Sequence, residues 1–223
     1  MCRFFEGAFV DHAALQDIEY VWRLEPDVVF RCAVPYDAVR DIRVAGKNYG
    51  SAISLWEVGA TAPSLFRAAA AFKDAHRLLT SSVWAALTSA SWAPWPLRAV
   101  LVRTTAHRDG RGNSWNLCRF RSNVEMTALW WYRRASYRAF AAHLDRTTGF
   151  YFERLGDVPV RTLAAAMLLR PEELYRFEDL GYECPPFWTC PRNAPDRQMP
   201  KSQLLGPPGG FSAGREGAVG CWC

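Results

Sequence analysis

Short strand-like apolar segments alternate with longer helical ones along this chain of 223 residues, and no other feature constrains the fold as strongly. Residues 18–34 indicate a strand, an acidic turn and a resumed apolar segment, and residues 48–58 predict another strand. Helical spacing marks 63–79, a run from Ser122 to Trp131, 134–147 and 158–169. This alternation favours an α/β fold with a sheet layered against helices.

The chain is long enough for one large domain or part of a larger one, which we place at residues 1–205, and its 50% apolar and 14% aromatic residues allow a substantial core. Residues 81–108 carry three tryptophans and two prolines without clean periodicity. We expect this stretch to be either a helix-loop insertion or an irregular excursion. The Gly- and Pro-rich residues 206–223 predict a disordered tail.

The charge of the chain excludes one class of partner. The net charge is +5, and the basic residues are scattered rather than gathered into a stripe. A nucleic-acid binder needs clustered Lys and Arg to displace counterions from phosphates, so we expect no nucleic-acid partner. Neither a signal peptide nor a membrane-spanning apolar run is recognisable, and a lumenal protein would need a targeting segment outside this chain.

Seven cysteines are widely dispersed, and none of them forms a CxxC pair, which argues against structural zinc. Such dispersal suits disulfides in an oxidising compartment. Buried thiols in a cytosolic protein explain the same pattern equally well. The odd number leaves at least one thiol unpaired within the chain.

Three carboxylate positions are candidates for chemistry. Glu25-Pro26-Asp27 places two acids at a strand end, as a site for Mn²⁺ or Mg²⁺ requires, although most such triplets are solvated turns. Glu57 ends an apolar segment and is either a buried functional acid or a surface residue. Glu125 follows Ser122-Asn123, and a capping-box partner is a commoner interpretation than a nucleophile.

The segment 150–157, Phe-Tyr-Phe-Glu-Arg-Leu-Gly-Asp, sets aromatic residues beside acids. Aromatic faces stack on sugars and carboxylates bind hydroxyls, so this segment is a candidate sugar pocket. A core strand that ends in a Gly-Asp turn is the alternative interpretation.

These motifs occur in a specific order. Met1-Cys2-Arg3-Phe4 comes first, followed by residues 20–28 (Tyr-Val-Trp-Arg-Leu-Glu-Pro-Asp-Val), 49–54, 116–118, 122–125, 149–160, 181–182 and Cys190-Pro191. The series resembles the fungal Ktr/Mnt (Kre2-like) α-1,2-mannosyltransferases of glycosyltransferase family 15, over residues 1 to about 191 and apart from the insertion. The run at 150–160 is the most specific part of this resemblance.

The resemblance implies an α/β, GT-A-like fold, a mixed sheet with flanking helices, incomplete at its N-terminus. It implies an enzyme of the Golgi lumen or membrane that retains configuration while moving mannose from GDP-mannose to mannosylated glycan acceptors, with Mn²⁺ as cofactor. Full-length relatives carry a single-pass anchor that is absent here. By position, Glu25 corresponds to the metal carboxylate and Glu125 to the carboxylate facing the anomeric carbon, while Glu57 and Asp157 correspond to acids that bind acceptor or donor.

This sequence departs from the family pattern in three ways. It starts at the Met-Cys-Arg segment, so we expect the upstream part of the guanosine pocket to be missing. Residues around 85–105 are extra. Cys184 occupies the position of a metal-binding histidine, and thiolate is a poor partner for Mn²⁺. We therefore expect no mannose transfer by the chain alone.

Two other hypotheses remain open. One is a truncated or catalytically dead homologue that binds glycans or acts as a lumenal scaffold. The other is an unrelated disulfide-bonded lectin, which would leave the ordered acidic motifs unexplained. The resemblance to a lumenal family further implies that four cysteines, Cys2, Cys32, Cys118 and Cys190, are disulfide-bonded.

Overall fold

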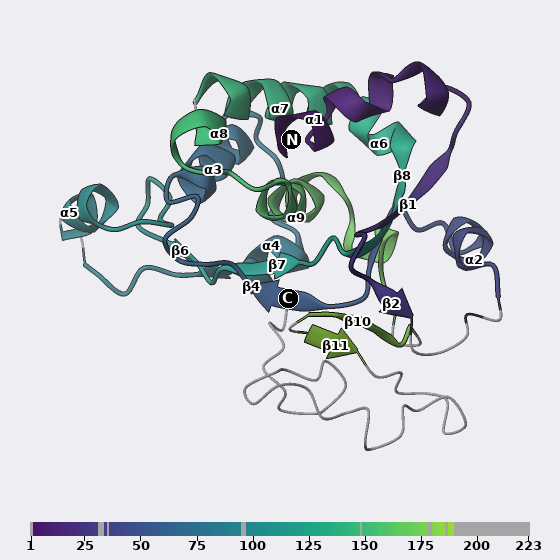
Figure 1. Ribbon diagram of the computed structural model, residues 1–223. Coiled ribbons are helices and arrows are strands. Elements are labelled where there is room, and N and C mark those ends of the chain that lie inside the picture. Colours follow the sequence, from purple (N-terminus) through teal and green to yellow (C-terminus); the bar gives the residue numbers. More distant parts are fainter. Residues whose placement is uncertain are drawn as a thin grey trace.

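The computed structural model describes residues 2–30, 34, 36–94, 97–147, 149–177, 180–185 and 187–189 (Figure 1). The helices are α1 (Cys2–Phe5), α2 (Ala38–Val44), α3 (Leu65–Ala75), α4 (Ser82–Leu87), α5 (Leu97–Thr104), α6 (Leu129–Arg133), α7 (Ala135–Arg146), α8 (Gly149–Phe152) and α9 (Asp157–Leu168), with 3-10 turns η1 (Ala8–Asp11), η2 (Ala13–Leu15) and η3 (Pro171–Glu173). The strands are β1 (Tyr20–Leu24), β2 (Val29–Phe30), β3 (Tyr49–Ser51), β4 (Ser54–Trp56), β5 (Thr88–Ser89), β6 (Ser114–Trp115), β7 (Cys118–Phe120), β8 (Val124–Ala128), β9 (Leu174–Arg176), β10 (Tyr182–Cys184) and β11 (Phe187–Thr189). None of these helices is long and apolar enough to cross a membrane.

A four-stranded sheet with the order β1-β8-β3-β9 lies at the centre of the fold. Strands β1 and β3 run antiparallel to β8, whereas β9 runs parallel to β3. Every residue of β8 is buried, because the strand is paired on both sides and covered on both faces. The predicted α/β architecture with a mixed sheet and flanking helices is confirmed.

Helix α9 is the central helix of the larger hydrophobic core. Its residues 159–167 are all buried, as expected for a helix that is apolar on nearly every side. Pro159 is tolerated because it lies in the first turn, where no intrahelical donor is lost. Thr162 fastens the helix to β7, since its hydroxyl accepts a hydrogen bond from the Phe120 amide at 2.9 Å. Figure 1 shows α9 between α7 and the strand pair β4–β7.

A smaller antiparallel sheet, β11-β10-β2, brings two distant segments together. Strand β2 follows the Glu25-Pro26-Asp27 turn, and it pairs with β10 so that Val29 lies opposite Glu183. This pairing places the acidic turn near Cys184, the last residue of β10.

Three predicted helices, over 63–79, 134–147 and 158–169, are confirmed as α3, α7 and α9. The helix predicted from Ser122 to Trp131 is wrong for its first part, because residues 124–128 form the central strand β8 and only α6 is helical. The predicted strand 48–58 is divided at Ala52-Ile53 into β3 and β4, which belong to different sheets.

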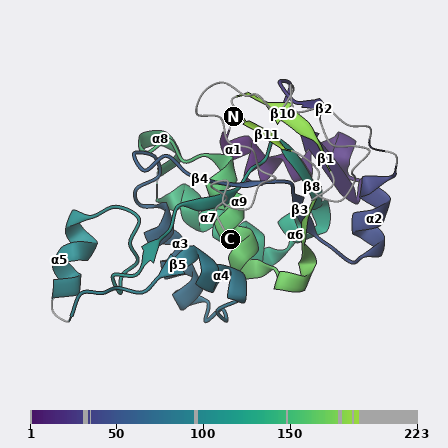
Figure 2. The ribbon, with the colours of Figure 1, turned by 90° about the horizontal axis from the view of Figure 1, so that it is seen from below.

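The stretch 81–108 is only partly peripheral. Trp84 of α4 stacks on Phe66 with ring centroids 5.4 Å apart, and Leu87 is fully buried, so both belong to the core. Helix α5, in contrast, has no buried residue and stands away from the other helices (Figures 1 and 2). The domain limits and the insertion stay predictions, and the tail 206–223 lies outside the described residues.

Replacing Ser81 by alanine should lower the free energy of unfolding by about 1–2 kcal/mol. The Ser81 hydroxyl caps α4 by accepting a hydrogen bond from the Trp84 amide at 3.0 Å, and it donates to the Ala166 carbonyl at 2.7 Å. That carbonyl lies in the last turn of α9, where the carbonyl groups lack amide donors from within the helix. Urea unfolding measures the loss, and Ser82→Ala is the matched control because the adjacent Ser82 is exposed. Equal losses in both variants would contradict the capping role.

Candidate active site

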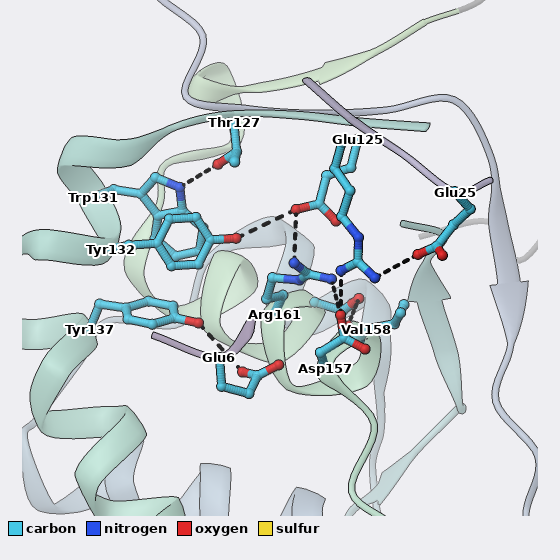
Figure 3. Close-up of polar contacts among 12 residues, drawn as sticks. Glu6, Glu25, Glu125, Thr127, Trp131, Tyr132, Tyr137, Asp157, Val158 and Arg161 are labelled. Carbon is cyan, nitrogen blue, oxygen red and sulfur yellow. Dashed lines mark hydrogen bonds and ion pairs between the residues drawn. The ribbon is translucent and has the colours of Figure 1, made fainter. Parts of the chain in front are cut away.

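Glu125 lies at the centre of the main sheet with only 1% of its surface exposed. On β8 it pairs with Arg23 of β1 and with Ser51 of β3. Its Oε1 accepts a hydrogen bond from the Tyr132 hydroxyl at 3.5 Å and lies 3.3 Å from Arg161 Nη1 (Figure 3). The capping-box interpretation of Glu125 is wrong, because the residue sits in a strand and not in a first helical turn.

Asp157 and Arg161 reach the same place from the first two turns of α9. They are four residues apart, so they lie on one face of the helix. Arg161 Nη2 donates to Asp157 Oδ2 at 2.6 Å, and Arg161 is only 1% exposed. A single guanidinium therefore holds two carboxylates, that of Asp157 and that of Glu125 (Figure 3).

Arg23 extends this arrangement to the acidic turn. Its guanidinium donates to the Asp157 carboxylate and also to Glu25 Oε1, the latter at 2.5 Å. Positive and negative side chains thus alternate in one connected set, here called the charge network: Glu125, Arg161, Asp157, Arg23 and Glu25. The structure brings three of the predicted site residues together in this network.

Burial and the two arginines move the pKa values of the two inner carboxylates in opposite directions. Burial raises the pKa of Glu125, although the charges of Arg161 and Arg23 oppose it. Burial also acts to raise the pKa of Asp157, but Arg161 and Arg23 outweigh it, so this pKa is lowered. Asp157 is therefore the carboxylate that stays ionised more readily, whereas the ionisation of Glu125 depends on its neighbours.

The predicted metal position combines Asp27, rather than Glu25, with Cys184. The buried Cys184 thiol donates to Asp27 Oδ2 at 3.3 Å and accepts from Arg121 Nη2 at 3.3 Å. Glu25 instead faces Arg23. Within the described part of the chain, no group of three or more His, Cys, Asp or Glu side chains is placed to hold a metal ion. A thiol, a nearby guanidinium and so few oxygen donors fit Mn²⁺ poorly.

Glu57 lies elsewhere, at the end of β4. Its Oε2 is 3.0 Å from Arg119 Nε on β7, and its Oε1 accepts from the Val58 amide at 2.8 Å and from the Thr61 hydroxyl at 3.2 Å. These contacts fasten the loop after β4 to β7. None of these contacts, within the part of the chain that the structure describes, joins Glu57 to the charge network. The catalytic role of Glu57 stays a prediction.

The aromatic segment before Asp157 is helical, so its interpretation as a core strand is wrong. Tyr151 and Phe152 in α8 are 64% and 84% exposed. The next residue, Glu153, accepts from the Ser64 amide at 3.0 Å and from its hydroxyl at 2.7 Å, at the start of α3. Exposed aromatic rings are available for stacking on a sugar, and the sugar-pocket hypothesis remains a prediction.

Cys118 is disulfide-bonded, as predicted, and fully buried. The other three cysteines of that prediction, Cys2, Cys32 and Cys190, have side chains outside the described part, so for them it stays a prediction. Cys184 is a free thiol.

Sequence reasoning missed the basic and phenolic members of the site, namely Arg23, Tyr132 and Arg161. Two of them carried a local signal. Arg161 follows Asp157 by one helical turn, and Arg23 lies two residues before Glu25 in the sequence. Tyr132 had no such signal, because only the turn from β8 into α6 brings its hydroxyl back to Glu125.

Comparison with known protein families gives one match across most of the chain. The profile described as "Glycolipid 2-alpha-mannosyltransferase" matches residues 1–201. Alpha-1,2 mannosyltransferase KTR1 of Saccharomyces cerevisiae is 36% identical over 192 residues, which are 86% of this chain and 44% of that protein. Glycolipid 2-alpha-mannosyltransferase 1 of Candida albicans is 35% identical over 193 residues, 86% of this chain and 40% of that protein. The chain thus spans less than half the length of these relatives.

Solved structures share the fold. Core-mannan synthase A (CmsA/Ktr4) of Aspergillus fumigatus, in its Mn/GDP form, has a TM-score of 0.75 and 32% identity, and the match covers 90% of this chain and 51% of that one. The mannosyltransferase Ktr4p of Saccharomyces cerevisiae in complex with GDP has a TM-score of 0.72 and 28% identity, with 92% and 52% covered. These structural similarities agree with the GT-A-like fold expected from the sequence.

Proposed function

Because the chain belongs to the glycolipid 2-alpha-mannosyltransferase family, we propose that the protein is a retaining α-1,2-mannosyltransferase. Its donor is GDP-mannose, and its acceptor is the 2-hydroxyl of a mannose-containing glycan. The observation that carries the proposal is Glu125, a buried carboxylate on the central strand that is joined through the charge network to the Glu25 turn. Transfer through an oxocarbenium-like transition state needs such an anion beneath the sugar ring.

The chemistry assigns a task to each side chain. The bond between the anomeric carbon and the pyrophosphate breaks, and its electron pair leaves with GDP. Glu125 stabilises the positive charge that develops on the sugar, either by covalent attack or by its charge alone. The acceptor oxygen then forms the new bond, and its proton passes to the departing phosphate. Arg161, itself paired with Asp157, holds Glu125 in place during these steps.

Mn²⁺ is the proposed cofactor, since the related core-mannan synthase A is known in an Mn/GDP form. A divalent ion supplies charge that neutralises the departing pyrophosphate. Asp27 offers carboxylate oxygens of the kind that such an ion prefers, whereas Glu25 faces Arg23 and Cys184 offers sulfur and contacts Asp27 directly. The ion would therefore be held weakly in this chain.

Replacing Cys184 by histidine should tighten Mn²⁺ binding in the presence of GDP by about tenfold or more. Imidazole nitrogen suits Mn²⁺ better than thiol sulfur does, and the change releases Asp27 from its contact with the thiol at 3.3 Å. Isothermal titration of MnCl₂ into the GDP-loaded chain measures the affinity. Cys184→Ser is the control, since it removes sulfur without adding a nitrogen ligand. Equal Mn²⁺ affinity in the histidine variant and the parent would contradict the assignment of a metal to this position.

The proposed function is tested by transfer. The purified chain and its Cys184→His variant are incubated with GDP-mannose, MnCl₂ and α-methyl mannoside, and the product linkage is determined by NMR. An α-1,2-linked dimannoside formed by either protein supports the proposal. Absence of this product from both, together with absent GDP binding in a titration, overturns it.

A second candidate function is that of a catalytically inactive homologue that binds glycans. Two observations favour it: Glu125 is only 1% exposed, and Cys184 occupies the expected metal position. Tyr132, whose hydroxyl contacts Glu125, lines a cavity of about 620 Å³ that also holds the acids Glu6, Asp11 and Asp145. Binding of mannobiose without GDP binding or transfer favours this candidate over the transferase.

The proposal extends to location. The relatives are fungal mannosyltransferases, and the Golgi lumen or membrane is the compartment we propose. The Cys118 disulfide is compatible with an oxidising lumen.

A further inference from the structure

Arg161 has an unusual position for an arginine, since only 1% of its surface is exposed in the middle of the core. Its Nη1 lies 3.3 Å from Glu125 Oε1, and its Nη2 donates to Asp157 Oδ2 at 2.6 Å. A planar guanidinium has a fixed angle between its nitrogens, so it sets the position of the two carboxylates relative to each other. A buried arginine can be retained only if it is paired in this way.

The two oxygens of the Glu125 carboxylate have different surroundings. Oε1 receives both donors, the Tyr132 hydroxyl at 3.5 Å and the Arg161 guanidinium. Oε2 is buried and, within the residues that the structure describes, has no hydrogen-bond partner. The Tyr49 hydroxyl, from β3, also acts on this carboxylate and works to lower its pKa against the larger, raising effect of burial.

We propose that Arg161 is the positioning residue of this site, which holds Glu125 by Oε1 and keeps the carboxylate ionised. The inference rests on the proposed mannosyl transfer. A neutral glutamic acid could neither attack nor stabilise an oxocarbenium ion, so the ionised form is the one that the reaction needs.

Among the described groups around Glu125, Arg161 is the cation in direct contact with its carboxylate. The groups that face this carboxylate are Arg23 from β1, Tyr49 from β3, Tyr132 from α6, and Asp157 and Arg161 from α9. Burial raises the pKa of both tyrosines well above its usual value, so they are neutral hydroxyls. Arg23 is already paired with Asp157 and Glu25. Removing the Arg161 cation should therefore return Glu125 toward its protonated form.

The titration of Glu125 tests this inference without any need for activity. The chain is labelled with ¹³C at the glutamate side-chain carboxyl carbon, and the Glu125 resonance is identified by its absence from a Glu125→Gln sample. In Arg161→Met the titration midpoint of Glu125 should rise by about one to three pH units. Arg161→Lys should raise the midpoint less, because an ammonium group keeps the charge but cannot bridge both carboxylates. Arg138→Met is the control, since it removes an arginine from an exposed pair with Asp11 and should leave the midpoint unchanged.

The inference is overturned if the Glu125 midpoint in both Arg161 variants equals that of the parent. Should Arg161→Met fail to fold, the lysine variant decides by the same comparison. In transfer assays, Arg161→Lys should lower kcat, leave the KM for GDP-mannose nearly unchanged and move the acid limb of the kcat profile to higher pH. A rise in KM alone would assign Arg161 to donor binding and overturn the positioning role. If neither the parent nor its Cys184→His variant transfers mannose or binds GDP, the proposed function fails, whereas the titration still decides whether Arg161 controls the ionisation of Glu125.

Discussion

In a form of the protein that transfers mannose, replacing Glu125 by glutamine should lower kcat by about 10²–10³-fold or more, with little change in the KM for GDP-mannose. Glutamine has nearly the same volume as glutamate, but it carries no charge to stabilise an oxocarbenium-like transition state. The effect falls on kcat because this interaction strengthens as the positive charge develops on the sugar. Steady-state kinetics at saturating acceptor measure both constants, and circular dichroism verifies that the fold is intact.

Glu19→Gln is the matched control for this experiment. Glu19 pairs with Arg43 on the surface, with both side chains more than 60% exposed, so the same chemical change there should leave the kinetics unchanged. An increase in KM with an unaltered kcat in Glu125→Gln would contradict the catalytic assignment. Glu125 would then be a residue of plain substrate binding.

Replacing Asp157 by asparagine should lower the free energy of unfolding at pH 7 by about 3–5 kcal/mol. The side chain is 13% exposed and neutralises two arginines, Arg23 and Arg161, which would be left with excess positive charge. The loss should be larger than that of the surface variant Asp145→Asn, which breaks an exposed pair with Arg3 and should cost about 0–1 kcal/mol.

The pH dependence of this effect has a definite sign. Arg161 and Arg23 lower the pKa of Asp157 in the folded protein below its ordinary value of 3.8, despite burial. The stability that Asp157 contributes is therefore complete above the unfolded pKa and is lost as the pH falls through the lower folded pKa. Urea unfolding of parent and variant, compared between pH 7 and about pH 2, should show their difference shrinking below pH 4. A difference independent of pH would indicate that Asp157 acts through packing rather than through charge.

The helical layer of the fold could be predicted from the sequence because its signal is local. Residues 158–169 are apolar at almost every position, and a helix of that kind has to be buried. The same holds for α3 and α7, whose apolar residues recur at helical spacing. The central strand β8 could not be found in this way. It has only five residues, two of them are polar, and its strand conformation depends on pairing with β1 and β3, which are distant in the sequence.

The candidate site shows the same limit. Glu25, Glu125 and Asp157 could be named because the order of motifs resembles that of a known family, and the structure brings these three together. Their connection through Arg23 and Arg161 could not be predicted, since Arg23 and Asp157 are 134 residues apart in the sequence. Glu57 could also be named from the sequence, but the structure places it against Arg119 of β7 and not in the charge network. The sequence of a strand end does not indicate whether its carboxylate faces a site or a neighbouring strand.

The charge network also has a consequence for how the chain finds its native strand alignment. Strand β1 packs apolar side chains on both faces of the sheet, with Val21 against the larger core and Trp22 against the smaller one, so apolar burial alone specifies its alignment with β8 weakly. A slip by one residue would turn Arg23 to the opposite face of the sheet, where Trp22 and Met126 now lie opposite each other. Asp157 would then lose one of its two cations, and a guanidinium would be stranded among apolar residues. We expect the buried ion pairs to make misaligned sheets unstable during folding, so that the native register of β1 and β8 is selected.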